Sequence, residues 1–219
     1  MSSNTSNAGA SESALLESTL SGRAHRLADR GLFLKKFLQK GRVISSAVPS
    51  SKVLVESMLR HVDFNRPATI VELGAGTGPV TELVLERLRP HHRFVAVEND
   101  PDFCEVLRRR FPEVTLLQMD ATRLLEPFTR MGIDRVDYIL SGLPAPNLPA
   151  RGAVRLWRWL RHLMPPDGLF IQMTIAPLVY RTFYDRLFDS VSYRMVWWNV
   201  PPGGIYCCSH PRPRLARER

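Results

Sequence analysis

The sequence predicts an α/β fold with a mostly parallel, seven-stranded sheet that carries helices on both faces. From Pro67 onward, short runs of apolar and β-branched residues alternate with helical stretches, and this alternation is typical of parallel sheets. A glycine-rich turn directly joins the first of these strands to the first helix. Near the end, two β-rich runs flank Pro201-Pro-Gly-Gly204, which predicts a closing antiparallel hairpin.

The elements of this fold follow one another without an internal repeat. Short apolar runs predict the strands, and the segments between them have a helical pattern. The predicted strands are 68–73, 93–99, 114–120, 135–142 and 168–175. The predicted helices are 79–88, 100–111, 151–164 and 177–188, and the predicted hairpin is 193–209.

A tail and a basic segment precede this domain. Residues 1–22 are rich in Ser, Asn and Ala, which predicts a disordered tail. Residues 23–51 are expected to form a basic helix, up to about Lys40, and a turn. The folded domain would then span 52–209, and 210–219 would form a basic tail.

The predicted N-terminal helix is amphipathic, because its apolar and basic residues occupy opposite arcs. The apolar arc holds Phe33, Leu34, Phe37 and Leu38, and the basic arc holds Lys35, Lys36 and Lys40. Such a helix suits the surface of a bilayer that contains anionic lipids, and we expect these seven residues to contact a membrane. The alternative is an ordinary helix that covers the core and exposes its lysines to solvent.

Positive charge is concentrated at the ends of the chain. The net charge is +9, yet residues 43–208 hold 19 basic residues against 17 acidic ones. Residues 23–42 alone hold seven basic residues against one acidic residue. Because enzymes of nucleic acids more often spread basic residues over the folded body, we expect an anionic membrane as the partner and no nucleic acid.

Composition excludes several classes of protein. Apolar residues make up 44% of the chain, too many for a wholly disordered protein. The three cysteines, Cys104, Cys207 and Cys208, are too few for a disulfide framework and indicate a reducing, cytoplasmic compartment. No apolar run reaches the roughly 18–20 residues of a spanning helix. No Cys and His cluster has the spacing of metal ligands, so no metal is expected.

The strongest functional signal is Glu72-Leu-Gly-Ala-Gly-Thr-Gly78, between the first strand and the first helix. Its glycines let the backbone turn sharply and let a ligand approach main-chain N–H groups. A carboxylate at Glu72 would repel a pyrophosphate and attract an ammonium, which favours S-adenosylmethionine over a dinucleotide. The residues expected to bind this cofactor are Glu72, Gly74, Ala75, Gly76, Thr77 and Gly78.

Two further acids end the next two strands. Glu98 stands about 20 residues after the glycines, where a carboxylate can accept hydrogen bonds from both ribose hydroxyls. Asp120 ends the third strand, where a carboxylate can accept from the adenine amino group. Each acid alone could be a solvated loop residue, but together they predict a cofactor site at the carboxyl edge of the sheet. The neighbours Asn99, Ala121 and Ser141 are expected at the same site.

The order of these motifs resembles the class I S-adenosylmethionine-dependent methyltransferases, over roughly 68–209, and implies their Rossmann-like fold. Three motifs are similar to those of the bacterial phospholipid N-methyltransferases, which convert phosphatidylethanolamine into phosphatidylcholine. They are Ser141-Gly-Leu-Pro144, Phe33-Leu-Lys-Lys-Phe37 and Asn199-Val-Pro-Pro202. The resemblance implies a peripheral enzyme at the inner face of the cell membrane, which methylates phosphatidylethanolamine or its mono- and dimethyl forms. We expect the protein to be a monomer.

Within this resemblance, the motif after the fourth strand is expected to act on the substrate amine. The Ser141 hydroxyl and the carbonyls of Gly142 and Leu143 would hold and aim the neutral amine. Pro144 would rigidify the turn because its ring fixes φ. Tyr180 is a further candidate for an acceptor or proton relay, or it is an ordinary aromatic residue of a helix.

Two other functions stay open at this point. The rRNA adenine dimethylases share the fold and a similar N-terminal helix, but they normally place an aromatic residue after the proline to stack the target base. This chain has Ala145 there. The other alternative is a cofactor-binding membrane sensor without catalysis, against which the intact Ser141-Gly-Leu-Pro144 argues.

Overall fold

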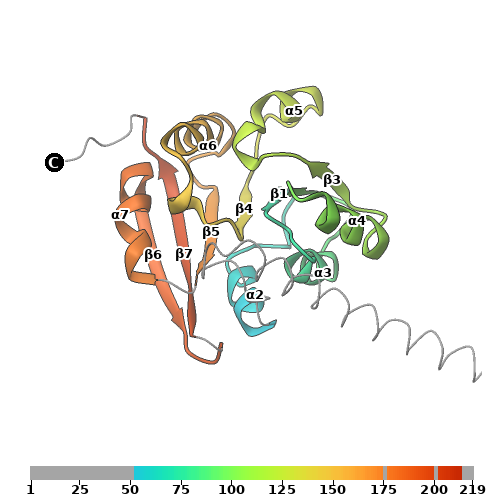
Figure 1. Cartoon of the computed structure of the whole chain (residues 1–219), viewed down its shortest axis with the longest axis horizontal. Helices are drawn as coiled ribbons and strands as arrows, with labels where there is room; N and C mark the ends of the chain where they lie inside the picture. Colours follow the sequence, from blue (N-terminus) through green and yellow to red (C-terminus); the bar gives the residue numbers. More distant parts are fainter. Residues whose placement is uncertain (1–51, 175–176, 200–201, 214–219) are drawn as a thin grey trace, which may run out of the picture. The chain divides into compact units, whose positions relative to one another are not determined.

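The computed structural model describes residues 52–174, 177–199 and 202–213. The predicted membrane-contact residues between Phe33 and Lys40 lie outside the described residues, as do the rest of 1–51 and residues 214–219. The described elements form three layers, in which a seven-stranded sheet lies between two layers of helices (Figure 1).

The sheet is parallel over its first five strands and antiparallel over its last two. Its strands lie in the order β3-β2-β1-β4-β5-β7-β6, and β7 runs antiparallel to both of its neighbours. The strands are β1 (Ala68–Leu73), β2 (His92–Glu98), β3 (Thr115–Gln118), β4 (Tyr138–Ser141), β5 (Leu169–Thr174), β6 (Phe188–Val196) and β7 (Gly203–Pro211). This topology confirms the predicted class, a mostly parallel sheet that closes with an antiparallel hairpin.

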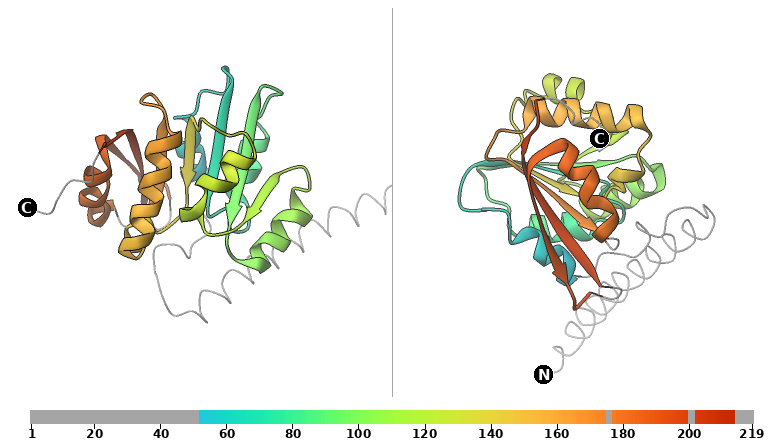
Figure 2. Two further views of the ribbon diagram at one scale, coloured as in Figure 1. Left: turned by 90° about the horizontal axis from the view of Figure 1, so that it is seen from above. Right: turned by 90° about the vertical axis from the view of Figure 1, so that its left-hand side faces the viewer.

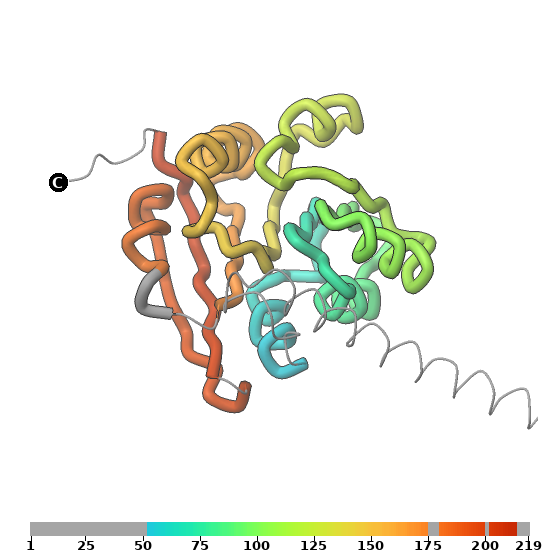
Figure 3. The backbone as a smooth tube through the Cα atoms, viewed as in Figure 1, coloured from blue at the N-terminus to red at the C-terminus, as the bar shows by residue number. Residues whose placement is uncertain are grey.

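Helices cover both faces of the sheet. The α-helices are α2 (Lys52–Leu59), α3 (Pro79–Leu85), α4 (Pro101–Arg110), α5 (Leu125–Arg130), α6 (Ala150–Leu163) and α7 (Pro177–Leu187). Two short 3-10 helices are η1 (Ala121–Arg123) and η2 (Ala145–Asn147). The right-hand view of Figure 2 shows α6, in gold, on one side of the sheet and α2, in cyan, on the other. Helix α2 packs against β5, β7 and β6, beside which it lies in Figure 3.

Side chains of the central strand β1 point alternately to the two faces of the sheet, and both faces are buried. Val71 packs in the same apolar cluster as Trp159 of α6, whereas Ile70 packs in the cluster that holds Met58 of α2. This double burial explains why 68–73 is a nearly continuous apolar run rather than an alternating one.

Local sequence signals place the starts of two helices. Asp100 caps α4, since its carboxylate accepts from the backbone N–H groups of Asp102 (3.0 Å) and Phe103 (3.4 Å). Pro101 occupies the first position of that helix, where no intrahelical donor is needed. Helix α3 likewise starts with a proline, directly after Gly78. Both starts agree closely with the sequence prediction.

Three elements differ from the prediction. The sequence analysis did not predict α2 or α5, which have eight and six residues and offer only about two turns of pattern. The prediction placed Phe188 in a helix and started the hairpin at Tyr193. Strand β6 instead begins at Phe188, directly after α7, because its pairing with β7 extends as far as Pro211.

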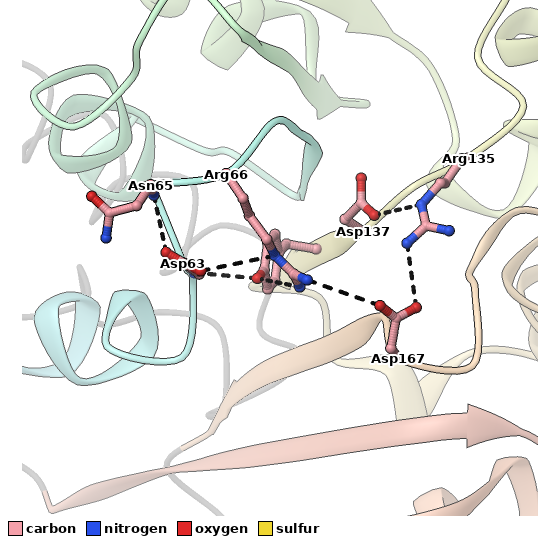
Figure 4. Close-up of polar contacts among 7 residues, drawn as sticks. Asp63, Asn65, Arg66, Arg135, Asp137 and Asp167 are labelled. Atoms are coloured by element: carbon pink, nitrogen blue, oxygen red, sulfur yellow. Dashed lines mark hydrogen bonds and ion pairs between the residues drawn. The ribbon is translucent and has the colours of Figure 1, made fainter.

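Polar residues join the segments that precede three strands at the amino edge of the sheet (Figure 4). The Asp137 carboxylate accepts from the Thr69 backbone N–H (2.9 Å) and from Arg135 Nε (2.7 Å). Asp167 lies 3.3 Å from Arg135 and 3.9 Å from Arg66. These contacts fix the amino ends of β1, β4 and β5, whereas the predicted site residues lie at the opposite, carboxyl edge.

Candidate functional site

The carboxyl edge of the sheet brings the predicted motifs together. Leu73, the last residue of β1, pairs with Val97 of β2 and with Ser141 of β4. Ser141 in turn pairs with Gln172 of β5. The glycine loop, Glu98 and the turn after β4 therefore share one edge, which is where open α/β sheets bind ligands.

The glycine loop turns back over the ends of β1 and β2. The backbone N–H groups of Gly74 and Ala75 donate to the Val97 carbonyl at 2.8 and 3.2 Å. Gly78 has a φ of +88°, and a Cβ there would overlap the Phe111 ring, so backbone and packing both require glycine. Gly76 has a φ of +57°, and a Cβ there would meet no described atom within 4 Å. A ligand can therefore approach the main chain closely at Gly76.

Glu98 is held in place by backbone donors. Its Oε2 accepts from the Gly76 N–H at 2.8 Å. Its Oε1 accepts from the N–H groups of Asn99 and Asp100, both at 2.8 Å. The side chain thus ties the glycine loop to the end of β2. A carboxylate offers about four acceptor positions, and three are used here, so Oε2 keeps one position that can accept from a ribose hydroxyl.

Glu72 is a buried acid, 2% exposed, one residue before the end of β1. Its Oε2 accepts from the Thr81 hydroxyl of α3 at 2.6 Å. Burial raises the pKa of Glu72 to about 7; the Thr81 hydrogen bond opposes this rise and the charge of Glu98 adds to it. A cation beside Glu72 would favour its charged form. A buried acid at the end of β1, directly before the glycine loop, therefore fits S-adenosylmethionine, which carries an ammonium.

Asp120 caps η1 and lies beside an arginine of α6. Its Oδ1 accepts from the Thr122 N–H at 2.8 Å, and its Oδ2 lies 3.7 Å from Arg155. Arg155 Nε also donates to the Thr122 hydroxyl at 3.2 Å. The structure therefore places Asp120 in a fixed turn after β3, with Ala121 buried behind it.

The turn after β4 packs directly against the glycine loop. The Gly142 N–H donates to the Leu73 carbonyl at 2.9 Å, and a Cβ on Gly142 would lie 3.2 Å from the Gly74 oxygen. Ser141 is fully buried, and its hydroxyl oxygen accepts from the Leu143 N–H at 3.3 Å. The motif predicted to hold the substrate amine and the loop predicted to hold the cofactor are therefore adjacent.

The side chain of Gln172, in β5, holds this turn through a hydrogen bond. Its side-chain amide donates to the Leu143 carbonyl at 2.9 Å and to the Met173 carbonyl at 2.7 Å. Its Oε1 is buried and has no hydrogen-bond partner among the described residues. One lone pair of the Leu143 carbonyl is thus already used, which leaves the other for a substrate amine.

The remaining predicted residues lie at the border of the site. Pro144 precedes η2, whose first residue, Ala145, is fully buried. Tyr180 of α7 is 4% exposed and belongs to the apolar cluster that also contains Phe170 and Tyr184. Little of its ring is open to a substrate, and its predicted part in proton transfer stays a prediction.

Three site residues were missed by the sequence analysis: Thr81, Arg155 and Gln172. Gln172 left a signal, because it is a polar residue inside the apolar run 168–175. Thr81 and Arg155 left none, since only the packing of α3 and α6 brings them to Glu72 and Asp120.

The described part of the chain lacks two features that bear on metals and membranes. No group of three or more His, Cys, Asp or Glu side chains there could hold a metal ion. Within the same residues, no helix has both the length and the apolar character to cross a membrane.

Comparison with known proteins places the chain among methyltransferases. A family model described as a methyltransferase domain matches residues 70–168. An ornithine lipid N-methyltransferase from Singulisphaera acidiphila is 38% identical over 180 residues, which cover 81% of this chain and 94% of that protein. A ribosomal RNA small subunit methyltransferase A from a Synechococcus strain is 33% identical over 117 residues, which cover 46% of this chain and 40% of that protein.

Solved structures share the fold at lower identity. TrmN from Thermus thermophilus superposes with a TM-score of 0.55 at 20% identity, over 73% of this chain and 48% of that one. Human methyltransferase-like protein 13, in complex with SAH, superposes with a TM-score of 0.54 at 20% identity, over 76% of this chain and 83% of that one. These likenesses agree with the sheet order and the closing hairpin described above.

Proposed function

This chain belongs to the class I S-adenosylmethionine-dependent methyltransferases, and we propose that it N-methylates the primary amine of a membrane lipid. S-adenosylmethionine is the methyl donor of this family and leaves as S-adenosylhomocysteine. The observation that carries the proposal is the similarity to a lipid N-methyltransferase over nearly the whole of that relative. The match to the methyltransferase domain alone would support the chemistry and leave the acceptor open.

Two lipids with a primary amine are candidate acceptors. The name of the relative favours ornithine lipid. The motifs Ser141-Gly-Leu-Pro144 and Asn199-Val-Pro-Pro202 resemble the phospholipid N-methyltransferases and favour phosphatidylethanolamine and its partly methylated forms. Both lipids present a primary amine at the bilayer surface. We place ornithine lipid first, because that similarity extends over most of both chains.

The residues of the cofactor side would hold the donor in the glycine loop, which is adjacent to the turn after β4. When bound, S-adenosylmethionine supplies an electrophilic methyl group on its sulfonium. Glu72 and the open main chain at Gly76 would bind its methionine part, Glu98 its ribose and Asp120 its adenine. Such a reaction depends mainly on positioning and electrostatics.

The turn after β4 would hold the acceptor amine. A lipid ammonium must lose a proton to water before its nitrogen can attack, and oxygen acceptors in this turn would hold the neutral amine through its N–H groups. The Ser141 hydroxyl and the carbonyls of Gly142 and Leu143 would supply such acceptors. Gln172 would keep the Leu143 carbonyl, and with it the whole turn, in one position.

A diacyl lipid does not leave its bilayer easily, so the enzyme must reach the membrane surface. The amphipathic segment with Phe33, Leu34, Phe37 and Leu38 would supply this contact, and its lysines would add attraction to anionic lipids. We therefore propose peripheral association with the cytoplasmic face of the membrane.

The test is transfer of radiolabelled methyl groups to vesicles, with the products separated by thin-layer chromatography. The vesicles contain phosphatidylglycerol and either ornithine lipid or phosphatidylethanolamine. We expect labelled lipid in the ornithine lipid vesicles, and at least a tenfold loss, roughly, in a Glu98→Gln variant. Confirmed cofactor binding with no labelled lipid in either mixture would contradict the proposal.

RNA adenine methylation is the second candidate, because the ribosomal RNA methyltransferase A proteins also match part of the chain. Two observations favour a lipid instead. The match to the lipid enzyme covers far more of both proteins. Position 145, where the RNA enzymes have an aromatic residue, is an alanine with no ring on which a target base could stack, and it is fully buried. Methyl transfer to RNA oligonucleotides, with no transfer to lipid, would make RNA the favoured substrate.

A further inference from the structure

The turn between β6 and β7 presents two adjacent tryptophans to solvent. Trp197 is 69% exposed and Trp198 is 88% exposed. Among the described residues, the next most exposed large apolar side chains are Val53 at 41% and Leu125 at 39%. Burial of a tryptophan side chain removes a large apolar surface from water, which is favourable. Two adjacent tryptophans that stay exposed therefore require an explanation.

The tryptophans project from a turn that is anchored to the body of the protein. Val196, just before them, is buried in the same apolar cluster as Leu54 of α2, and Asn199, just after them, is also buried. Gly203 packs closely, since a Cβ there would lie 3.1 Å from the Thr174 oxygen. The exposure of the pair is therefore set by the fold on both sides of it.

This turn lies at the same edge of the sheet as the candidate site. Strand β7 begins beside the carboxyl end of β5, where Gly204 pairs with Thr174. The site residue Ser141 pairs with Gln172, only two residues earlier on β5. The end of β6 and the start of β7 therefore lie at the edge to which an acceptor lipid would have to come (Figure 1).

We propose that Trp197 and Trp198 insert into the interface of a lipid bilayer and hold the carboxyl edge of the sheet against it. The inference rests on the proposed function and adds a membrane contact within the folded domain. An indole ring has an apolar body and a polar N–H, and it settles at the boundary between acyl chains and headgroups. The chain has no Asp or Glu between Asp189 and Glu218, so no carboxylate of this segment opposes an anionic surface.

A bilayer fits this pair better than a protein partner. Two tryptophans bury at most about 500 Å² together, whereas a stable protein interface needs roughly 800 Å² on each side. Insertion into a bilayer needs no complementary partner surface, and two indoles at the tip of a hairpin are sufficient anchors.

The experiment uses the full chain, without methyl donor, and vesicles of phosphatidylethanolamine and phosphatidylglycerol. The chain has four tryptophans, and the other two, Trp157 and Trp159, lie on α6. Because residues 1–51 contain none, tryptophan fluorescence does not report on the N-terminal segment. We expect vesicles to shift the emission to shorter wavelength, and lipids with brominated acyl chains to quench it.

The variant is Trp197→Ala with Trp198→Ala, and the matched control is Leu125→Ala, an exposed apolar residue on α5. In Figure 1, α5 lies far from the β6–β7 turn. We expect the double variant to lose the emission shift and about tenfold in vesicle partitioning, and the control to behave as wild type. Thermal unfolding checks that the double variant is folded, which its exposed positions predict.

Several outcomes would overturn the inference. Wild-type partitioning and quenching in the double variant would do so. A dimer that becomes a monomer in the double variant, with unchanged vesicle binding, would assign the pair to self-association. Loss of RNA binding alone would assign it to nucleic acid. Because binding is measured without methyl donor, vesicle insertion without lipid methylation would leave the inference standing and remove the proposed function. Lipid methylation by the wild type, together with wild-type vesicle insertion in the double variant, would leave the proposed function standing and overturn the inference.

Discussion

Glu72 combines burial with the need to carry a charge. A buried carboxylate is costly unless it is paired, and Thr81 is the residue that donates hydrogen bonds to Glu72, with its hydroxyl at 2.6 Å. The nearby carboxylate of Glu98 disfavours the charge further. This arrangement is unfavourable without a ligand and becomes favourable when an ammonium lies beside it, as expected for a site that selects a cationic cofactor.

We predict that the stability of the cofactor-free protein falls as pH rises through about 7. The folded pKa of Glu72, about 7, lies above its ordinary value of 4.5. The stabilising contribution of the protonated form is therefore complete below about pH 4.5 and lost as pH rises through 7. Urea unfolding at pH 5 and pH 8 should show a difference of up to about 3 kcal/mol from this group.

The variant Glu72→Gln provides the control, because its amide cannot ionise. Its unfolding free energy should lack this part of the pH dependence. Saturating S-adenosylmethionine should weaken the dependence in the wild type, since an ammonium beside Glu72 favours the charged form. An identical pH dependence in wild type and variant would show that Glu72 titrates in its ordinary range.

At the scale of elements, the sequence analysis predicted the helices and strands whose formation depends on a local residue pattern. The strand 68–73 and the start of α4 at Asp100 were predicted because apolar runs and capping residues act over a few positions. Glu72, Glu98 and Ser141 were grouped because parallel strands end at one edge. The hydrogen bond between Gln172 and Leu143 could not be predicted, because the register of β4 against β5 brings them together.

The link between β5 and the turn after β4 gives a second prediction. Gln172→Leu removes the donor that holds the Leu143 carbonyl. It also removes the unpaired Oε1, so we expect stability to change by about 1 kcal/mol or less. Methyl transfer should fall about 10- to 100-fold in kcat/KM, because the turn that aims the amine is no longer held. Cofactor affinity, measured by calorimetry, should stay near that of wild type.

Ser192→Ala is the matched control for this variant. Its hydroxyl also donates to a backbone carbonyl, that of Cys207, but on the exposed side of the β6–β7 hairpin. Wild-type kcat/KM is expected for Ser192→Ala. Equal activity of Gln172→Leu and wild type would show that the turn keeps its position without this donor.

At the scale of the whole molecule, the two edges of the sheet have different roles. The amino edge holds the polar contacts around Asp137 and Asp167, and the carboxyl edge holds the glycine loop, Glu98 and the Trp197–Trp198 pair. The central strands between them, such as β1 and β4, are buried on both faces and closely packed. A change at the amino edge should therefore alter the stability of the fold while leaving the geometry of the site intact.

Asp137→Ala tests this separation of the two edges. Asp137 is only 9% exposed, and its carboxylate accepts from both the Thr69 N–H and Arg135. Its removal leaves a backbone donor unpaired at the start of β1, which should cost about 2–3 kcal/mol in urea unfolding. Asp167→Ala, at a more exposed position, should cost about 1 kcal/mol or less. Both variants should bind S-adenosylmethionine with wild-type affinity well below their unfolding temperatures, and weaker binding by Asp137→Ala would mean that the amino edge sets the position of the site.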